Sequence, residues 1–129
     1  MKTLCISLLL LSSMLLIAQK DEATALNEMF KGRYHFDANK KGLTLELLKE
    51  GDAIRTDAFS FMFIDWDKVY YDEVGNEIEI TCLEKFAPCI DRRIMKTKSR
   101  QQYPKTEIKV KDEKEAQRAI NKLRSMAGL

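Results

Sequence analysis

Two cysteines in the second half of the chain have the types and spacing that could do chemistry. Cys82 and Cys89 are separated by the six residues of LEKFAP. A catalytic redox pair usually has two residues between its cysteines, and a structural zinc site needs about four ligands. His35 is the only histidine and lies far away in sequence. The pattern therefore favours a structural disulfide, and the alternative is two reduced cysteines packed in the core.

The N-terminus bears on this choice because it indicates the compartment. Lys2 precedes an apolar run from Leu4 to Ile17, which ends abruptly at Lys20. The run is shorter than the roughly 20 residues of a membrane-spanning helix and has the flanks of a secretory signal; a short membrane anchor is the alternative. We expect cleavage after Ala18. Cys5 would leave with the signal, and the exported protein, periplasmic or secreted, would keep an oxidisable pair and no transmembrane segment.

Residues for catalysis are sparse. A nucleophilic triad would need His35 as its base, and no G-x-S-x-G pattern frames a serine. A single histidine on an alternating strand is more often exposed or hydrogen-bonded than catalytic. The chain also lacks a glycine-rich phosphate loop and the spacing of an EF-hand. We therefore predict a protein that is not an enzyme and that has no cofactor and no metal site.

Charge is segregated along the chain. From Asp65 to Glu84, Lys68 is the only base among the charged residues, and from Asp91 to Lys105, Asp91 is the only acid. The basic run is a candidate anion-binding site for a lipid surface or an acidic partner. The alternative, which we favour, is that the two segments pair as neighbouring strands of a hairpin closed by the cysteine loop. The net charge of +2 gives no argument for nucleic acid as a partner. The candidate anion-binding residues are Arg92, Arg93, Lys96, Lys98, Arg100 and Lys105.

Periodicity predicts a mostly β protein between two helices. Residues 21–31 fit a short helix that ends before Gly32. At the other end, Asp112 and Glu115 form a capping box ahead of an apolar stripe at helical spacing. That stripe comprises Ala116, Ala119, Ile120, Leu123 and Met126. Alternating or apolar segments predict seven antiparallel strands at 33–36, 43–49, 53–64, 68–73, 77–82, 89–96 and 105–111.

These elements predict an α+β fold in which a curved antiparallel sheet, or small barrel, is capped by the C-terminal amphipathic helix. The element order, with YYDEVGNEIEITC and TEIKVKDEKEAQRAINKLRSM, resembles pleckstrin-homology-like domains from Arg33 to Ala127. The predicted organisation is a signal peptide (1–18), an N-terminal helical segment (19–32) and a PH-like domain (33–129). The resemblance implies a scaffold that binds peptides, lipids or other partners. We accordingly expect an exported binding module for a protein or peptide partner, with anion or lipid binding through residues 92–105 as the alternative.

Overall fold

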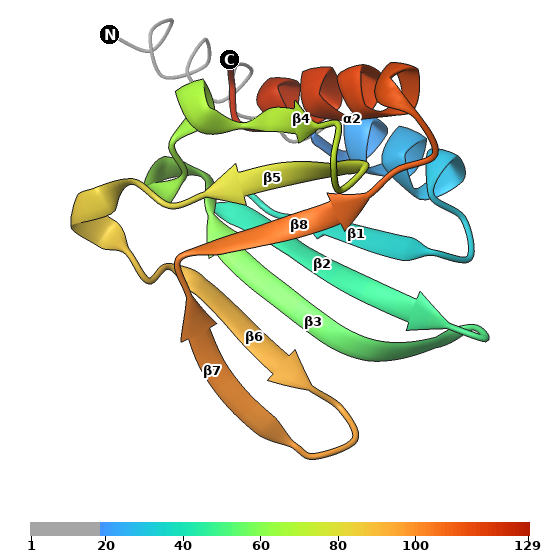
Figure 1. Cartoon of the computed structure of the whole chain (residues 1–129), viewed down its shortest axis with the longest axis vertical. Coiled ribbons are helices and arrows are strands. Elements are labelled where there is room, and N and C mark those ends of the chain that lie inside the picture. Colours follow the sequence, from blue (N-terminus) through green and yellow to red (C-terminus); the bar gives the residue numbers. More distant parts are fainter. Residues whose placement is uncertain (1–18) are drawn as a thin grey trace, which may run out of the picture.

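The structure is a computed structural model that describes residues 19–129, so the predicted signal peptide lies outside the described residues. Residues 19–29 are helical. Strands β1 to β8 follow, and the helix α2 ends the chain (Figure 1). The strands span Tyr34–Ala38, Gly42–Lys49, Asp52–Ser60, Tyr70–Asp72, Glu77–Thr81, Ile90–Ile94, Ser99–Tyr103 and Lys105–Lys109; α2 spans Glu113–Met126. Short 3-10 turns lie at Phe61–Phe63, Trp66–Lys68 and Glu84–Phe86.

The strands form two antiparallel sheets. The larger sheet has the order β1-β2-β3-β6-β7, and the smaller has the order β4-β5-β8. The α+β, mostly β class is confirmed, but the prediction of seven strands was wrong. Eight strands are present in the described chain, and they form two open sheets rather than a closed barrel. The unpredicted strand is β7, whose sequence SRQQY has no apolar alternation.

The predicted hairpin between the acidic and basic segments was also wrong. β5 pairs with β4 and β8 in the smaller sheet, whereas β6 pairs with β3 and β7 in the larger one. The chain changes sheets between Thr81 and Ile90, so Cys82 and Cys89 lie at the junction of two sheets. The apolar residues of β5 and the charged residues of β6 therefore never face each other across a ladder.

The predicted strand 53–64 ends early. β3 stops at Ser60, and Phe61–Phe63 form a 3-10 turn after which Ile64 makes a single bridge to Cys82. Both faces of the segment 53–64 carry apolar residues, which predicts a strand covered on both sides, but Met62 is 71% exposed, so that prediction was wrong for this part of the segment. Gly42 lies opposite Ser60 at the start of β2, where a Cβ atom would overlap the carbonyl oxygen of Phe59.

The core lies between the sheets and the two helices. The whole predicted stripe of α2 is buried and shares one cluster with Phe61 and Ile80, as the helical spacing predicted. The Asp112 carboxylate accepts a hydrogen bond from the backbone N–H of Glu115, which confirms the N-cap. The Glu115 side chain instead accepts from the N–H of Lys111, one residue before the position that a capping box would use.

A buried carboxylate links the two sheets. Asp57 of β3 is 1% exposed and accepts two hydrogen bonds from Arg92 of β6, at 2.8 and 3.0 Å. The hydroxyl of Thr106, on β8 of the smaller sheet, donates to the same carboxylate at 2.5 Å. Burying an ionised group is costly unless it is paired and hydrogen-bonded. This network therefore fixes how β8 lies over β3 and β6.

Candidate functional site

The four outer edges of the two sheets differ in what covers them. An outer strand presents backbone N–H and C=O groups that can pair with another chain unless something blocks them. The edge of β1 is blocked by the side chain of Asn27, from the N-terminal helix. Asn27 accepts from the N–H of Phe36 at 2.6 Å and donates to the carbonyl of Phe36 at 3.0 Å.

The smaller sheet is partly covered at both edges. On β8, the backbone N–H of Lys109 donates to the hydroxyl of Tyr34 at 3.0 Å. On the other side, β4 lies beside α2 (Figure 1), and Arg124 of that helix donates to the carbonyl of Trp66 in the 3-10 turn that precedes the strand. An added strand would therefore meet a side chain at the end of β8 and the helix α2 beside β4.

The edge of β7 is open. Within residues 19–129, the outer side of Ser99–Gln102 makes no backbone hydrogen bond, and all four residues are exposed. Figure 1 shows the β6–β7 hairpin extending beyond the smaller sheet, with β3 beside β6 and no helix or strand of residues 19–129 drawn beside the outer side of β7. β7 is thus a five-residue strand with one edge paired to β6 and the other available to a partner.

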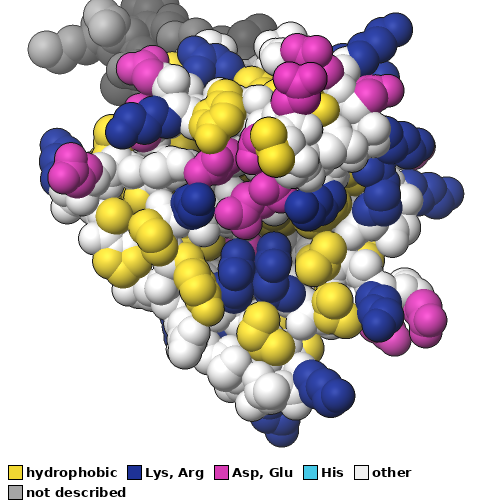
Figure 2. Space-filling model, in the orientation of Figure 1, with side chains coloured by type: hydrophobic (Ala, Val, Ile, Leu, Met, Phe, Trp, Pro, Cys, Tyr) yellow, Lys and Arg dark blue, Asp and Glu magenta, His cyan; other side chains and the backbone are white. Residues whose placement is uncertain are grey.

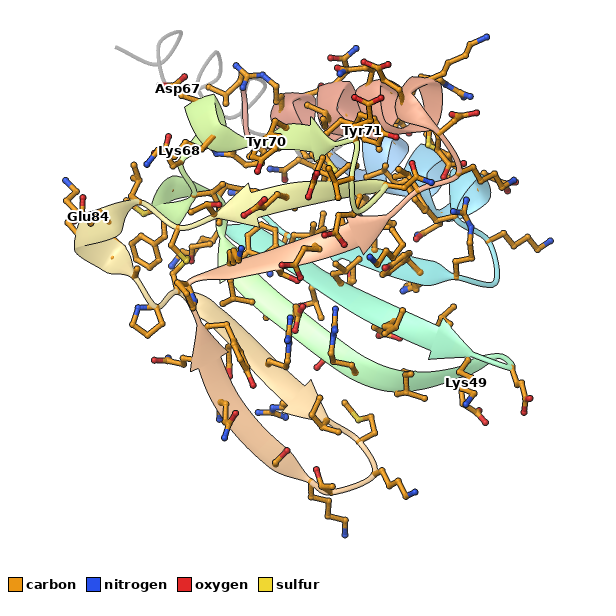
Figure 3. All side chains as sticks on the ribbon, in the orientation of Figure 1. Lys49, Asp67, Lys68, Tyr70, Tyr71 and Glu84 are labelled. Atoms are coloured by element: carbon orange, nitrogen blue, oxygen red, sulfur yellow. A yellow bond between two sulfur atoms is a disulfide. The ribbon has the colours of Figure 1, made fainter. Side chains whose placement is uncertain are left out.

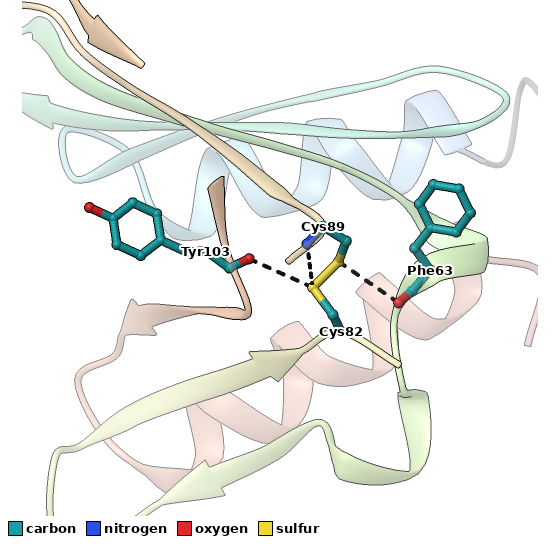
Figure 4. The surroundings of a disulfide bond; sticks show 4 residues. All are labelled: Phe63, Cys82, Cys89 and Tyr103. Carbon is teal, nitrogen blue, oxygen red and sulfur yellow. Dashed lines mark hydrogen bonds between the residues drawn. A yellow bond between two sulfur atoms is a disulfide. The ribbon is translucent and has the colours of Figure 1, made fainter. Parts of the chain in front are cut away.

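The base of this hairpin is fixed by the disulfide. Cys82 and Cys89 are bonded, with 5.9 Å between their Cα atoms, as the sequence favoured (Figure 4). The backbone N–H of Cys82 donates to the carbonyl of Pro104 at 2.9 Å, directly after β7. Cys89 directly precedes β6. The disulfide therefore holds the start of β6 against the smaller sheet, and the hydrogen bond from Cys82 to Pro104 holds the end of β7 there.

The two faces of β7 differ in chemistry. On the inner face, Tyr103 stacks against the guanidinium of Arg92, 4.4 Å from the ring centre, and its hydroxyl donates to Gln101 at 2.8 Å. On the outer face, Arg100 lies directly opposite Arg93 of β6. Like charges directly opposite each other on a sheet repel. The outer face consequently carries more positive charge than its own residues neutralise.

The structure separates the six candidate anion-binding residues. Arg92 is held by Asp57, and Lys105 of β8 lies 3.0 Å from Glu79 in the smaller sheet. The other four, Arg93, Lys96, Lys98 and Arg100, all belong to the outer part of the β6–β7 hairpin. Of these, only Arg100 makes an ion pair within the described chain, with Asp91 at 2.7 Å.

Three of these cations line an open pocket. It has a volume of about 300 Å³ and is formed by Arg93, Ile94, Met95, Lys98, Ser99 and Arg100. Figure 2 shows Lys and Arg side chains at the tip of the hairpin, at the bottom of the view, with no acidic side chain beside them. The pocket adjoins the open edge, because Ser99 and Arg100 belong to both.

Asp91, the acid on the outer face of β6, is already engaged. The bidentate hydrogen bond from Arg100 lowers the pKa of Asp91 despite partial burial, and the charges of Arg100 and Arg93 lower it further. The same contact raises the pKa of Arg100. Asp91 is therefore ionised at neutral pH and neutralises one of the two facing arginines.

The acidic segment lies elsewhere. In Figure 3, Asp67 and Glu84 belong to the 3-10 turns beside the smaller sheet, away from the β6–β7 hairpin at the bottom. Glu77 pairs with Lys109 at 2.6 Å across β5 and β8. The predicted pairing of opposite charges across a sheet thus occurs between β5 and β8, not between β5 and β6.

Other kinds of site find little support in the described part of the chain. Residues 19–129 hold no group of three or more His, Cys, Asp or Glu side chains placed to bind a metal ion. His35 is exposed on β1. Among the helices described, none is long and apolar enough to cross a membrane.

Sequence reasoning missed the open edge because β7 itself was not predicted. Its residues are polar on both faces, so neither a twofold period nor an apolar run marks it. The basic residues were visible in the sequence, but their division between two sheets follows from the chain crossing between them at the cysteine loop. Comparisons with protein families, with curated proteins and with solved structures found no match.

Proposed function

We propose that this protein is an exported, non-enzymatic binding module that captures an extended peptide or protein segment at the edge of β7. The observation that carries the proposal is the contrast between the edges. Side chains of Asn27 and Tyr34 bond to backbone groups of β1 and β8, and α2 lies beside β4 (Figure 1), whereas within residues 19–129 Ser99–Gln102 is exposed and unpaired on its outer side. In strand addition, backbone hydrogen bonds supply affinity and the side chains along the edge supply specificity.

The geometry of the hairpin supports this use of the edge. Each backbone hydrogen bond to a partner strand contributes only about 0.5–1.5 kcal/mol to the binding free energy. If the edge were flexible, the entropy lost in ordering it on binding would offset much of that contribution. Here the disulfide and the bond from Cys82 to Pro104 fix the base of the hairpin before any partner arrives. The edge is therefore preorganised for pairing.

Export is part of the same proposal. The sequence of residues 1–18 indicates a secretory signal, and a disulfide is compatible with an oxidising compartment. The resemblance to pleckstrin-homology-like domains belongs to the proposal as well, supported by the order of strands followed by one C-terminal helix. That resemblance implies a binding scaffold, but fold alone does not fix function.

Proline substitutions test the proposal. Neighbouring N–H groups of a strand point to opposite edges, so Gln101→Pro and Gln102→Pro remove different donors. One variant loses a bond to β6 and is destabilised; the other loses only an outward donor and keeps its stability. Peptides would first be selected from a displayed random library on the exported protein. We expect the stable proline variant to lose binding to these peptides, measured by fluorescence anisotropy; unchanged affinity would overturn the proposal.

A control for destabilisation is available on a covered edge. The N–H of Phe36 in β1 points outward to Asn27, so the N–H of the neighbouring His35 points toward β2, and His35→Pro weakens that pairing without touching β7. Its effect on stability can be measured separately by urea unfolding. If the folded fraction of this control binds the selected peptides normally, loss of binding at β7 is specific to that edge.

A further inference from the structure

From the charges around the open edge we infer that the captured segment is acidic, with a carboxylate side chain that lies on the outer face beside Arg100 and Arg93. This inference rests on the proposed strand addition and specifies the partner's chemistry. Neighbouring strands lie about 4.8 Å apart. A side chain on the outer face of an added strand is therefore the direct neighbour of Arg100, and Arg93 lies one strand further.

The positive charge on this face is in excess. Arg93 and Arg100 face each other, and Asp91 is the only acid that pairs with either of them in the described chain. Lys96 and Lys98 extend the positive charge through the exposed turn between the strands. An incoming carboxylate would relieve the repulsion between the facing arginines, whereas an incoming lysine would add to it.

The pocket gives the carboxylate a place to bind. Arg93 of β6, Arg100 of β7 and Lys98 of the turn between them line it, and Ile94 and Met95 supply apolar lining. Because the pocket is open and its cations are exposed, water and salt screen a charge pair formed there, so its contribution should depend on ionic strength. Figure 2 shows no acidic side chain beside the Lys and Arg side chains at the hairpin tip. Charge complementarity thus selects an acidic segment among the peptides that could pair with β7.

Asp91 makes the inference unusually testable. Its carboxylate accepts hydrogen bonds from Nε and Nη2 of Arg100, at 3.0 and 2.7 Å. Asp91 therefore competes with an incoming carboxylate for the Arg100 guanidinium. Asp91→Asn should leave Arg100 free and strengthen binding of an acidic peptide. Arg93→Gln with Lys98→Gln should weaken it. A purely structural role for these residues predicts no such opposite changes.

The experiment uses strand-forming probe peptides that alternate valine with glutamate, glutamine or lysine, and the exported protein with its disulfide formed. At low salt we expect the glutamate probe to bind roughly threefold to tenfold more tightly than the glutamine probe, with the difference shrinking as salt is added. Arg93→Gln/Lys98→Gln should abolish the difference, and Asp91→Asn should enlarge it. Lys114→Gln with Arg118→Gln also removes two positive charges, from the exposed face of α2, and should have no effect.

The outcomes separate the inference from the proposed function. If the glutamine probe binds as tightly as the glutamate probe and protects the same β7 amides from exchange, strand addition stands and the acidic preference is wrong. If no probe protects β7, both fail. If phosphatidylglycerol vesicles bind the protein through Arg93 while the peptide probes show no charge preference, the cations serve a membrane surface and the inference is overturned.

Discussion

At the residue scale, two aspartate–arginine pairs show how burial changes the value of the same contact. Asp57 and Asp91 each accept two hydrogen bonds from one arginine, Arg92 and Arg100 respectively. The Asp57 side chain is 1% exposed and also accepts a hydrogen bond from Thr106. The Asp91 side chain is 27% exposed, and that of its partner Arg100 is 62% exposed. Water screens the exposed pair, but removing one partner of the buried pair leaves a charge without compensation.

Replacing Asp57 should therefore be costly. We expect Asp57→Ala to lower the free energy of unfolding by about 3–5 kcal/mol, because Arg92 would remain largely buried without its counter-charge. Asp91→Ala removes the same chemistry from an exposed site and should leave the urea midpoint almost unchanged. Equal effects of the two substitutions, measured by urea unfolding, would show that burial does not set the strength of these pairs.

Glu115 gives a prediction about pH at the same scale. Burial alone would raise the pKa of Glu115, but hydrogen bonds from Arg33 and from the N–H of Lys111 lower the pKa below the usual value of a glutamate. A carboxylate whose pKa is lower in the folded state stabilises the fold above its unfolded pKa, and this contribution is lost as the pH falls through the folded value.

Glu115→Gln should consequently make the protein less sensitive to acid. Wild-type and variant stabilities, measured by urea unfolding, should differ most at neutral pH and converge as the pH falls below about 4. A difference that stays constant from neutral to acidic pH would mean that the ionised form of Glu115 contributes nothing to this dependence.

At the element scale, the helices and strands that were predicted correctly are those in which the spacing of apolar residues matches the pattern of burial. α2 has one apolar stripe, and every residue of it is buried. β5 alternates, and both of its isoleucines are buried while its polar residues are half-buried. Local pattern and tertiary environment agree in these elements, so sequence periodicity was sufficient to find them.

The secondary-structure predictions were wrong where tertiary contacts override the local pattern of apolar residues. Residues 61–64 look like a continuation of β3, but the chain turns there so that Ile64 can bridge to Cys82 of the other sheet. β7 is exposed on both faces and carries no pattern at all. The same reason explains what could be predicted of the candidate site. Its basic residues can be identified in the sequence, but the open edge beside them depends on which strands pair in the folded protein.

The contribution of α2 can be measured directly. Leu123 is fully buried against the sheets, so Leu123→Ala should lower the free energy of unfolding by about 2–5 kcal/mol. Gln117→Ala on the exposed face is the control and should change it by less than about 0.5 kcal/mol. A similarly small effect at Leu123 would mean that α2 is not part of the core.

At the scale of the whole molecule, two links hold the sheets together at the hairpin. The Cys82–Cys89 bond joins the end of β5 to the start of β6, and Asp57 joins β3 and β6 to Thr106 of β8. In the chain-entropy account, closing so short a loop stabilises the fold by about 2.5 kcal/mol. We expect reduction of the disulfide to lower the free energy of unfolding by about that amount. Identical urea curves with and without reductant would contradict this.

The central claim concerns the free edge of the larger sheet, and site-resolved amide hydrogen exchange tests it most directly. In the free protein, the outward N–H groups of Ser99–Gln102 should exchange rapidly, while those bonded to β6 should be protected. Adding the glutamate probe peptide at saturation should slow the outward amides of β7 and leave β1, β4 and β8 unchanged. Protection that appears at another sheet edge, or exchange at β7 that the peptide does not alter, would contradict the account.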